Sequence, residues 1–339
     1  RTHHRPMKVR RAHLEYLILN RLRRWDFYSK EENMKLGLVS AILDQSSYEE
    51  MIDTAAELGF ACVEAACWPQ GAAERRYGGV SHIDADRVLE EDAYAAHIRD
   101  YAREKEVEIS SLAYYPNTMD SNQEKREAAI RHLRKLICAS AKLGVNMVTT
   151  FIGRDQNKTV EENLELMKEI WPPILKLAEE NQVKVAIENC PMLFDQGQWP
   201  GGQNLMTTPY IWQKVFEILD SPYLGINYDP SHFVWQMVDY IKPIYQFKEK
   251  IFHVHYKDIK VYEDKLEQCG IMAYPLQYMS PKLPGLGDVD WGRYVSALTD
   301  IGYSGYTCIE VEDKAFEGSA EKILDSLRLS KRYMEQFVI

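Results

Sequence analysis

The sequence predicts an α/β protein in which eight strand and helix units alternate and close into a (β/α)8 barrel. Two observations carry this prediction. Three segments, at residues 56–64, 141–151 and 300–310, share the same order: the end of an amphipathic helix, a glycine, and a short apolar run. In addition, eight apolar runs of strand length alternate with helical patterns along residues 34–339. Glycine commonly caps the end of a helix, and unbroken alternation is typical of a closed parallel barrel.

The expected strands are short and mostly apolar, as buried parallel strands are. They fall at residues 35–39, 62–65, 108–113, 147–151, 184–188, 224–229, 251–256 and 307–310. The helical patterns fall at 48–58, 90–105, 123–143, 159–180, 209–219, 240–247, 291–300 and 319–336. Two connections are unusually long, 189–208 after strand five and 259–290 after strand seven. Because loops at the carboxyl ends of barrel strands build the active site, we expect both long loops to wall a substrate pocket.

Charge separates an N-terminal segment from the predicted barrel. Residues 1–33 hold nine Lys and Arg against four Asp and Glu, whereas the whole chain of 339 residues has a formal net charge of −10. We therefore expect residues 1–33 to be an N-terminal extension outside the barrel. Residues 34–339 are expected to form one catalytic domain, since α/β barrels often reach this length.

Composition also argues against several partners and locations. An acidic chain lacks the basic face that nucleic acid requires, so we expect no nucleic-acid binding. No apolar run approaches the roughly 20 residues of a membrane-spanning helix, so we expect no membrane insertion. The six cysteines form no Cys-x-x-Cys pair, and we expect a cytoplasmic protein. The expected partner is then a small molecule.

Four polar residues stand at the ends of the last four expected strands: Glu188, Asp229, His255 and Glu310. Side chains at the carboxyl ends of barrel strands point toward the active site, so neighbouring strands should bring these four groups together. Three carboxylates so close cannot all ionise without a compensating cation. Carboxylate oxygens with one imidazole suit Mn²⁺, Mg²⁺ or Co²⁺. The sequence therefore predicts one divalent metal ion at the mouth of the barrel.

With these motifs the sequence resembles the xylose-isomerase-like barrel superfamily, the sugar phosphate isomerase and epimerase group, over about residues 34–339. The resemblance rests on Glu188, the Asp-Pro-Ser-His segment 229–232, the His-x-His segment 253–255 and Glu310. The superfamily includes ketose 3-epimerases, inosose dehydratases and endonuclease IV. By this resemblance the four strand-end residues are the metal ligands, and Mn²⁺ is the favoured ion.

The resemblance implies a divalent-metal-dependent sugar isomerase or epimerase that abstracts a proton next to a sugar carbonyl. In ketose epimerases of this group the two glutamates flank the substrate and move the proton, so Glu188 and Glu310 are the expected catalytic residues. His232 is expected to contact substrate oxygens. The chemistry is coherent, because a metal that binds a carbonyl and a neighbouring hydroxyl acidifies the adjacent C–H bond.

Other polar residues on the same rim are candidates for substrate contact. The expected substrate-binding residues are His232, Lys257, Tyr115, Asn117, Arg154 and His82. For Lys257, a solvated loop pair with Asp258 is an equally good explanation. We interpret His253 as facing away from His255, with a buried structural role.

Tryptophans in or near the long loops are a further candidate group. Trp68, Trp199 and Trp235 are able to stack on sugar faces, although packing beneath long loops is the commoner role of such residues.

The sequence departs from the ketose epimerases after strand seven. Those enzymes, as the family is known, have a short loop there with a substrate-binding arginine, whereas here Lys257 and Asp258 precede a long insertion. Long loops would suit a larger substrate, and related barrels include the larger subunits of C-glycoside deglycosidases. The alternative function is therefore a lyase that cleaves 3-oxo-glycosides, of the C- or O-glycoside deglycosidase type. It would use the same proton removal and then β-elimination.

Two other classes are less favoured. A nuclease like endonuclease IV would need further His and carboxylate ligands on the earlier strands and a basic surface. A non-catalytic sugar-binding barrel would keep the metal motif and be inert. The expected partners are a sugar or glycoside, further copies of the chain in a homo-oligomer and, under the lyase alternative, a small second subunit.

Overall fold

The computed structural model describes residues 33–71, 78–193 and 196–338, and its eight parallel strands close into a barrel. The strands are β1 (Lys35–Val39), β2 (Cys62–Ala66), β3 (Glu108–Ala113), β4 (Met147–Thr150), β5 (Lys184–Glu188), β6 (Leu224–Tyr228), β7 (Ile251–Tyr256) and β10 (Tyr306–Ile309). Around the barrel they follow the order β1-β10-β7-β6-β5-β4-β3-β2, and each neighbouring pair is parallel. The predicted (β/α)8 barrel is confirmed. The expected N-terminal extension, residues 1–33, lies outside the described residues apart from Asn33.

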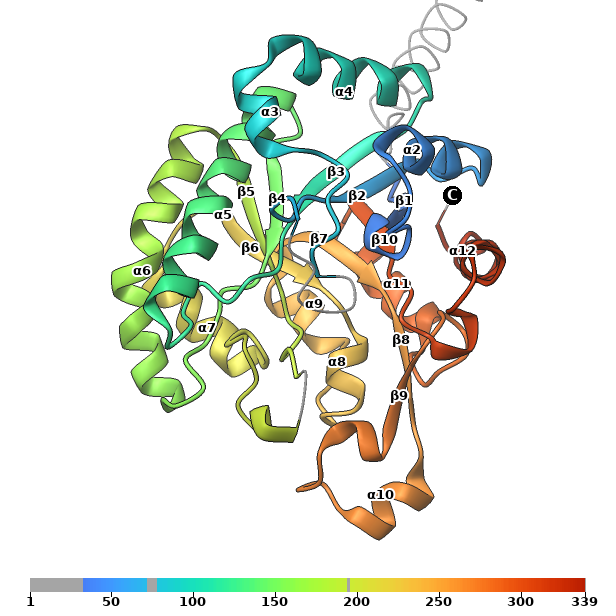
Figure 1. Ribbon diagram of the computed structural model, residues 1–339. Helices are drawn as coiled ribbons and strands as arrows, with labels where there is room; N and C mark the ends of the chain where they lie inside the picture. Colours follow the sequence, from blue (N-terminus) through green and yellow to red (C-terminus); the bar gives the residue numbers. More distant parts are fainter. Residues whose placement is uncertain (1–32, 72–77, 194–195, 339) are drawn as a thin grey trace, which may run out of the picture. The chain divides into compact units, whose positions relative to one another are not determined.

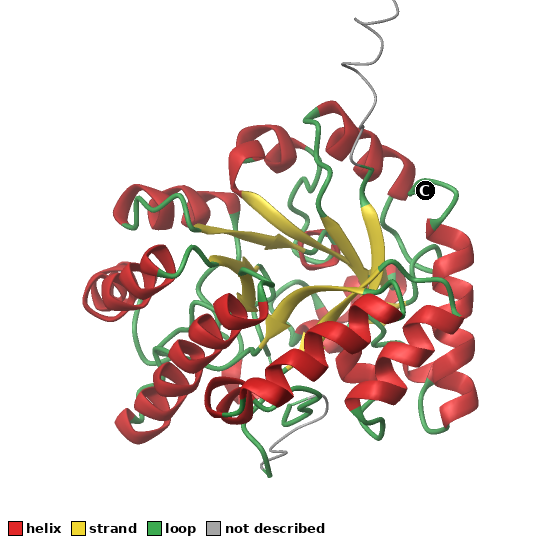
Figure 2. Ribbon diagram, turned by 90° about the horizontal axis from the view of Figure 1, so that it is seen from above, coloured by secondary structure: helices red, strands yellow, loops and turns green. Residues whose placement is uncertain are grey.

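Helices surround the barrel strands, as Figures 1 and 2 show from two directions. They are α2 (Tyr48–Glu57), α3 (Ala85–Glu90), α4 (Asp92–Glu104), α5 (Gln123–Leu143), α6 (Val160–Glu180), α7 (Pro209–Ile218), α8 (Ser231–Val234), α9 (Lys242–Gln246), α10 (Glu263–Cys269), α11 (Trp291–Asp300) and α12 (Ala320–Met334). Among the described residues no helix is both long and apolar enough to cross a membrane.

Local sequence signals fix several helix ends. Ser47 and Thr159 each form a capping box, in which the hydroxyl accepts from a backbone N–H three residues on and a glutamate there accepts in return. Gly144 ends α5 in the left-handed conformation, with φ +71°. The helix expected at 90–105 is observed as α4, and the preceding helix α3 was not predicted; the extended backbone of Glu91 separates the two.

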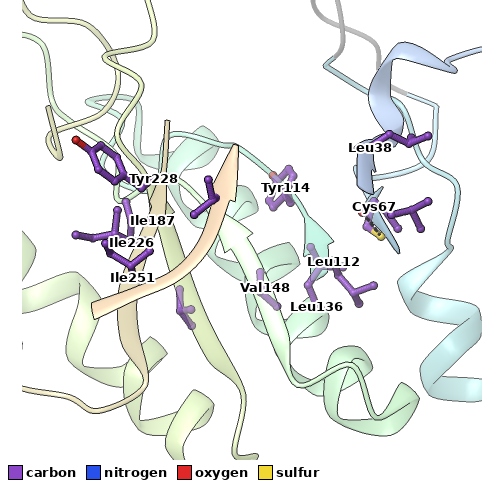
Figure 3. Packing of buried hydrophobic residues seen from close by; sticks show 14 of the residues in the cluster. Leu38, Cys67, Leu112, Tyr114, Leu136, Val148, Ile187, Ile226, Tyr228 and Ile251 are labelled. Carbon is purple, nitrogen blue, oxygen red and sulfur yellow. Dashed lines mark hydrogen bonds between the residues drawn. The ribbon is translucent and has the colours of Figure 1, made fainter. Parts of the chain in front are cut away.

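The main hydrophobic core lies between the barrel strands and the helices that cover them. Ile187 of β5, Ile226 of β6 and Ile251 of β7 are paired along the strands and form one part of it (Figure 3). Leu112 of β3 and Leu136 of α5 form another part, where strand meets helix (Figure 3). Apolar side chains on the outer strand face thus hold the helices on the barrel.

The inside of the barrel is largely polar. The Ser110 hydroxyl lies 2.9 Å from His253 Nε2, and His253 Nδ1 lies 3.0 Å from Asn227 Oδ1. All three residues are fully buried. Because buried polar groups are normally hydrogen-bonded, this chain of contacts across β3, β7 and β6 satisfies the polar interior.

The long connection after β7 is folded rather than irregular. It contains β8 (Asp258–Val261), α10, and β9 (Met279–Lys282), and β8 and β9 pair in antiparallel fashion. In Figure 1 this insertion projects from the barrel at the bottom of the view. The connection after β5 is shorter and contains the 3-10 helix Gln196–Gln198.

Asp258 fastens the base of this insertion to the barrel. Its carboxylate accepts hydrogen bonds from the backbone N–H groups of Ile259, Gly285 and Val289 and from the indole N–H of Trp291, at 2.8, 2.9, 3.1 and 2.9 Å. Asp258 and Lys257 are both buried, so the solvated loop pair, one of the two explanations considered for Lys257, does not exist. One carboxylate therefore joins β8, the loop before α11 and α11 itself.

We expect Asp258→Ala to lower the free energy of unfolding by about 2–4 kcal/mol, because it leaves buried N–H donors without an acceptor. Urea unfolding followed by circular dichroism would measure the change. Asp264→Ala, at an exposed position on α10, is the control and should cost less than about 0.5 kcal/mol. Equal effects of the two substitutions would contradict the anchoring role of Asp258.

Candidate metal centre and substrate cleft

The four strand-end residues converge at one end of the barrel. Glu188 ends β5, Asp229 follows β6, His255 lies near the end of β7, and Glu310 follows β10. These strands are consecutive neighbours around the barrel. One ligand atom from each residue lies within 4.8 Å of those of the other three. The convergence follows from the parallel arrangement, which places all four strand ends on the same rim.

The chemistry of these atoms fits a divalent cation. Glu188 Oε1, Asp229 Oδ2 and His255 Nδ1 are buried and make no hydrogen bond of regular geometry within the described residues, although charged neighbours lie 3.1 to 3.7 Å away. Buried polar atoms in native proteins almost always make such a bond. The three atoms belong to one cluster and are two carboxylate oxygens and an imidazole nitrogen, which are ligands that Mn²⁺, Co²⁺ and Zn²⁺ accept. The residues present therefore form a candidate divalent-metal site.

Both buried carboxyl groups are held in the ionised form that metal binding requires. Burial alone would raise the pKa of Glu188, but the His232 and His255 rings, whose nitrogens lie 3.6 and 3.7 Å from Oε1, lower it to about 2. Burial would also raise the pKa of Asp229, but the charges of Lys257 and His232 lower it below its ordinary value. Each group is thus a carboxylate at neutral pH.

Lys257 is a buried cation in the middle of this cluster. It is 3% exposed, and its ammonium donates to Glu310 Oε2 at 2.8 Å. The same ammonium lies 3.1 Å from Asp229 Oδ2 and 3.5 Å from Glu312 Oε2. Burial alone would lower the pKa of Lys257, but the three carboxylates raise it above its ordinary value. Lys257 is therefore charged, and Glu312 joins the cluster as a residue that the sequence did not single out.

Glu64 lies behind the candidate ligand His255 and is a second residue that sequence reasoning missed. It is fully buried in β2, and its Oε2 lies 2.8 Å from His255 Nε2. A carboxylate only accepts hydrogen bonds, so Nε2 carries the ring proton and Nδ1 keeps the lone pair that a metal would need. The sequence signal was a lone acidic residue within the apolar strand Cys62–Ala66.

The interpretation of His253 was half correct. It has a buried structural role, since Ser110 and Asn227 engage its two ring nitrogens. The expectation that it faces away from His255 was wrong, because residues two apart on a strand point to the same face. Both histidines face the barrel interior, where His253 Nδ1 lies 3.6 Å from Glu64 Oε2.

Three of the expected substrate-binding residues lie beside the candidate metal site. His232 Nε2 is 3.3 Å from Asp229 Oδ2, and Lys257 contacts Asp229 and Glu310. Tyr115 lines the same cavity as Glu188, with its hydroxyl donating to Glu64 Oε1 at 2.6 Å.

The other three expected residues lie elsewhere. Arg154 lines a neighbouring cavity. The Asn117 side chain binds the backbone of Arg154 and Met119, and the ring nitrogens of His82 contact the Ser40 hydroxyl and the Leu43 carbonyl. The structure does not bring Asn117 and His82 to the site, because their polar atoms are used within the fold.

A cleft extends from the candidate metal site toward the insertion. The cavity above the barrel shares Lys257 and Glu312 with a larger groove of about 470 Å³. Tyr262, Tyr274 and Met279 of the insertion line the outer part of this groove. The insertion therefore forms one wall of a space that begins at the candidate metal ligands.

Together the barrel and the ligand cluster define a (β/α)8 protein with a candidate divalent-metal site at the carboxyl ends of its strands. The family model of the xylose isomerase-like TIM barrel matches residues 52–333, and the chain belongs to this family.

Two bacterial proteins are similar to this chain in sequence. The chain is 24% identical over 304 residues to the uncharacterized protein YfiH of Bacillus subtilis, which covers 83% of this chain and 93% of that protein. It is 25% identical over 169 residues to the inosose dehydratase of Clostridium tetani, covering 47% of this chain and 53% of that enzyme.

Solved structures show the same fold at low sequence identity. The IOLI protein with a zinc atom bound superposes with a TM-score of 0.66 at 17% identity, over 90% of this chain and 99% of that one. A D-psicose 3-epimerase crystallised in the presence of D-fructose gives a TM-score of 0.64 at 16% identity, over 90% and 99%.

We expect Glu64→Gln to weaken Mn²⁺ binding by about 10–100-fold, because a neutral amide no longer fixes the proton on His255 Nε2. Isothermal titration of the full chain with Mn²⁺ would measure it. The control is Glu108→Gln, at a glutamate that pairs with Lys35 at the start of β3. Unchanged affinity in Glu64→Gln would remove Glu64 from the positioning of His255.

Proposed function

We propose that the protein is a divalent-metal-dependent sugar isomerase or epimerase that abstracts a proton next to a sugar carbonyl. One observation carries the proposal: ligand atoms of Glu188, Asp229, His255 and Glu310 lie within 4.8 Å of one another at the mouth of the barrel. Membership of the xylose isomerase-like family and the fold shared with a D-psicose 3-epimerase support it. Mn²⁺ is the ion that we propose, because three carboxylates with one imidazole favour a hard ion.

The ion held by these four ligands would polarise a sugar carbonyl and acidify the neighbouring C–H bond. Glu188 and Glu310 are the proposed proton carriers. Glu188 ends β5 and Glu310 follows β10, and β6 and β7 separate these two strands around the barrel, so their carboxylates reach the site from different directions. One carboxylate can then remove a proton from carbon while the other returns one, which is the requirement for epimerisation.

Neighbouring side chains are placed to bind and orient the substrate. Lys257 would hold the Glu310 carboxylate in position through the contact at 2.8 Å. His232 Nε2 lies 3.3 Å from Asp229 Oδ2 and 3.6 Å from Glu188 Oε1, beside the candidate metal ligands, and would bond to a substrate oxygen there. Tyr115 and Phe151 line the inner wall of the cavity and would exclude water there.

A lyase is the second candidate. It begins with the same proton removal and ends when a group at the β position leaves. Two observations favour it: the chain is similar to inosose dehydratases, whose name describes an elimination, and the groove continues well beyond the candidate metal site. A 3-oxo-glycoside would suit such a groove.

The test follows deuterium uptake by NMR in D₂O with Mn²⁺, offering free ketoses in one sample and 3-oxo-glycosides in another. We expect deuterium at carbon together with a new sugar isomer, and loss of both when the metal is removed with EDTA. Released aglycone without a new isomer would replace the isomerase proposal with the lyase.

Glu188→Gln and Glu310→Gln are each expected to slow the exchange by about 10²–10⁴-fold, because an amide carries no proton between carbon and solvent. Glu169→Gln, at an exposed position on α6, is the control. The metal content of each variant separates loss of the ion from loss of proton transfer. A variant that keeps both its metal and a normal rate would remove that glutamate from the proposed role.

A further inference from the structure

The substrate groove continues into a second cavity away from the candidate metal site. This cavity has a volume of about 270 Å³ and is lined by Arg154, Trp199, Trp235 and Tyr278, among others. It shares Trp235 and Pro191 with the groove of about 470 Å³. The lining residues thus form a continuous path from Lys257 and Glu312 to Arg154. We call the cavity of about 270 Å³ the distal cavity.

Arg154 brings an uncompensated positive charge to the distal cavity. Its Nε is buried and has no hydrogen-bond partner in the part of the chain that the structure describes. Across residues 33–71, 78–193 and 196–338, no carboxylate lies within 4.0 Å of its guanidinium, in contrast to the paired Arg87, Arg103 and Arg328. Leaving a partly buried cation without a partner costs free energy, and arginine keeps its charge at neutral pH. The arrangement indicates an anion that comes from outside the chain.

The Asn117 side chain holds the main chain of Arg154 in place. The Asn117 amide donates to the Arg154 carbonyl at 2.8 Å, and Asn117 Oδ1 accepts from the Arg154 N–H, also at 2.8 Å. Gly153 precedes it with φ +87°, and a Cβ there would lie 2.7 Å from Asn117 Oδ1. The interactions of Asn117 therefore fix the backbone from which the guanidinium extends, rather than serving the metal site.

Aromatic rings form the walls of the distal cavity. The ring centroids of Trp199 and Trp235 lie 6.3 Å apart at 57°. The Trp199 indole donates to the Met272 carbonyl, so the insertion holds this ring. Within the described residues the buried Trp235 indole N–H has no hydrogen-bond partner, so it is a second donor available to a ligand. Flat aromatic walls accept a planar apolar group, and the two donors accept its oxygens.

We propose that the distal cavity binds an aromatic carboxylate, as the far end of a sugar conjugate whose sugar end lies at the candidate metal site. The guanidinium fork of Arg154 pairs with the carboxylate, and the adjacent Trp199 and Trp235 rings form the wall against which the aromatic ring packs. The position of the sugar end rests on the proposed function, whereas binding in the distal cavity does not. A bare sugar hydroxyl would satisfy the indole N–H but would leave the guanidinium charge uncompensated.

The probes are benzoate, the neutral isostere benzamide, and inorganic phosphate, titrated into the full chain and followed by ligand-observed NMR. We expect benzoate to bind at least about tenfold more tightly than benzamide, since only benzoate pairs with the guanidinium. Phosphate should bind more weakly than benzoate, because it lacks the ring. Equal affinities of benzoate and benzamide, or of benzoate and phosphate, would overturn the proposal.

Variants assign the binding to the distal cavity. Arg154→Met should weaken benzoate binding about tenfold or more, and Arg154→Lys should weaken it less because the charge remains. Trp199→Leu should weaken benzoate without affecting phosphate. Arg131→Met is the matched control, at a largely exposed arginine that faces Glu127, and should change nothing. Benzoate affinity that is unchanged in both Arg154 variants would overturn the assignment, with circular dichroism confirming that each variant is folded.

These titrations need no turnover, so their result is independent of the proposed function. If only the proposed chemistry is wrong, the deuterium exchange assay fails while benzoate still binds with the expected dependence on Arg154. Conversely, metal-dependent isomerase activity together with a benzoate affinity that is unchanged by the Arg154 substitutions would support the proposed function and rule out the distal cavity as a carboxylate site.

Discussion

Buried charge at the mouth of the barrel is the constraint on which the site depends. Asp229 and His255 are fully buried and Glu188 nearly so, and an unpaired ion in such a place costs several kcal/mol. Lys257 compensates the carboxylates on one side, and Glu64 accepts from the ring N–H of His255 on the other. The carboxylate oxygens and the imidazole nitrogen that converge between them suit a divalent ion. A single requirement, the compensation of buried charge, thus explains both the ligand set and the residues packed around it.

The insertion after β7 gives this generic barrel mouth a particular shape. Asp258 fastens it to the loop before α11, and its tip holds the Trp199 ring through the Met272 carbonyl. Between these two attachments the insertion lines the groove that leads away from the metal ligands. The insertion and the loop after β5 thus line the groove, whereas the barrel strands supply the candidate metal ligands. This division follows the general separation of scaffold and loops in such barrels.

The fold was predictable because its signals are local. Each strand was placed within one residue of its observed bounds, since short apolar runs bounded by polar residues and glycine are read directly from the chain. Predictions failed where a longer-range influence acts. No glycine or proline in the sequence marks the break at Glu91 between α3 and α4. The antiparallel pair β8–β9 depends on the packing of the insertion, not on a repeated pattern.

The sequence by itself determined the barrel and the four candidate ligands, because the ligands occupy the ends of strands and parallel strands end on one rim. Only the tertiary structure decided what surrounds them. Glu64 reaches His255 across 191 residues of sequence, and Arg154 meets Trp199 and Trp235 only in the folded chain. Pairing between distant residues depends on the closure of the barrel and the docking of its loops, and no local pattern in the chain encodes either.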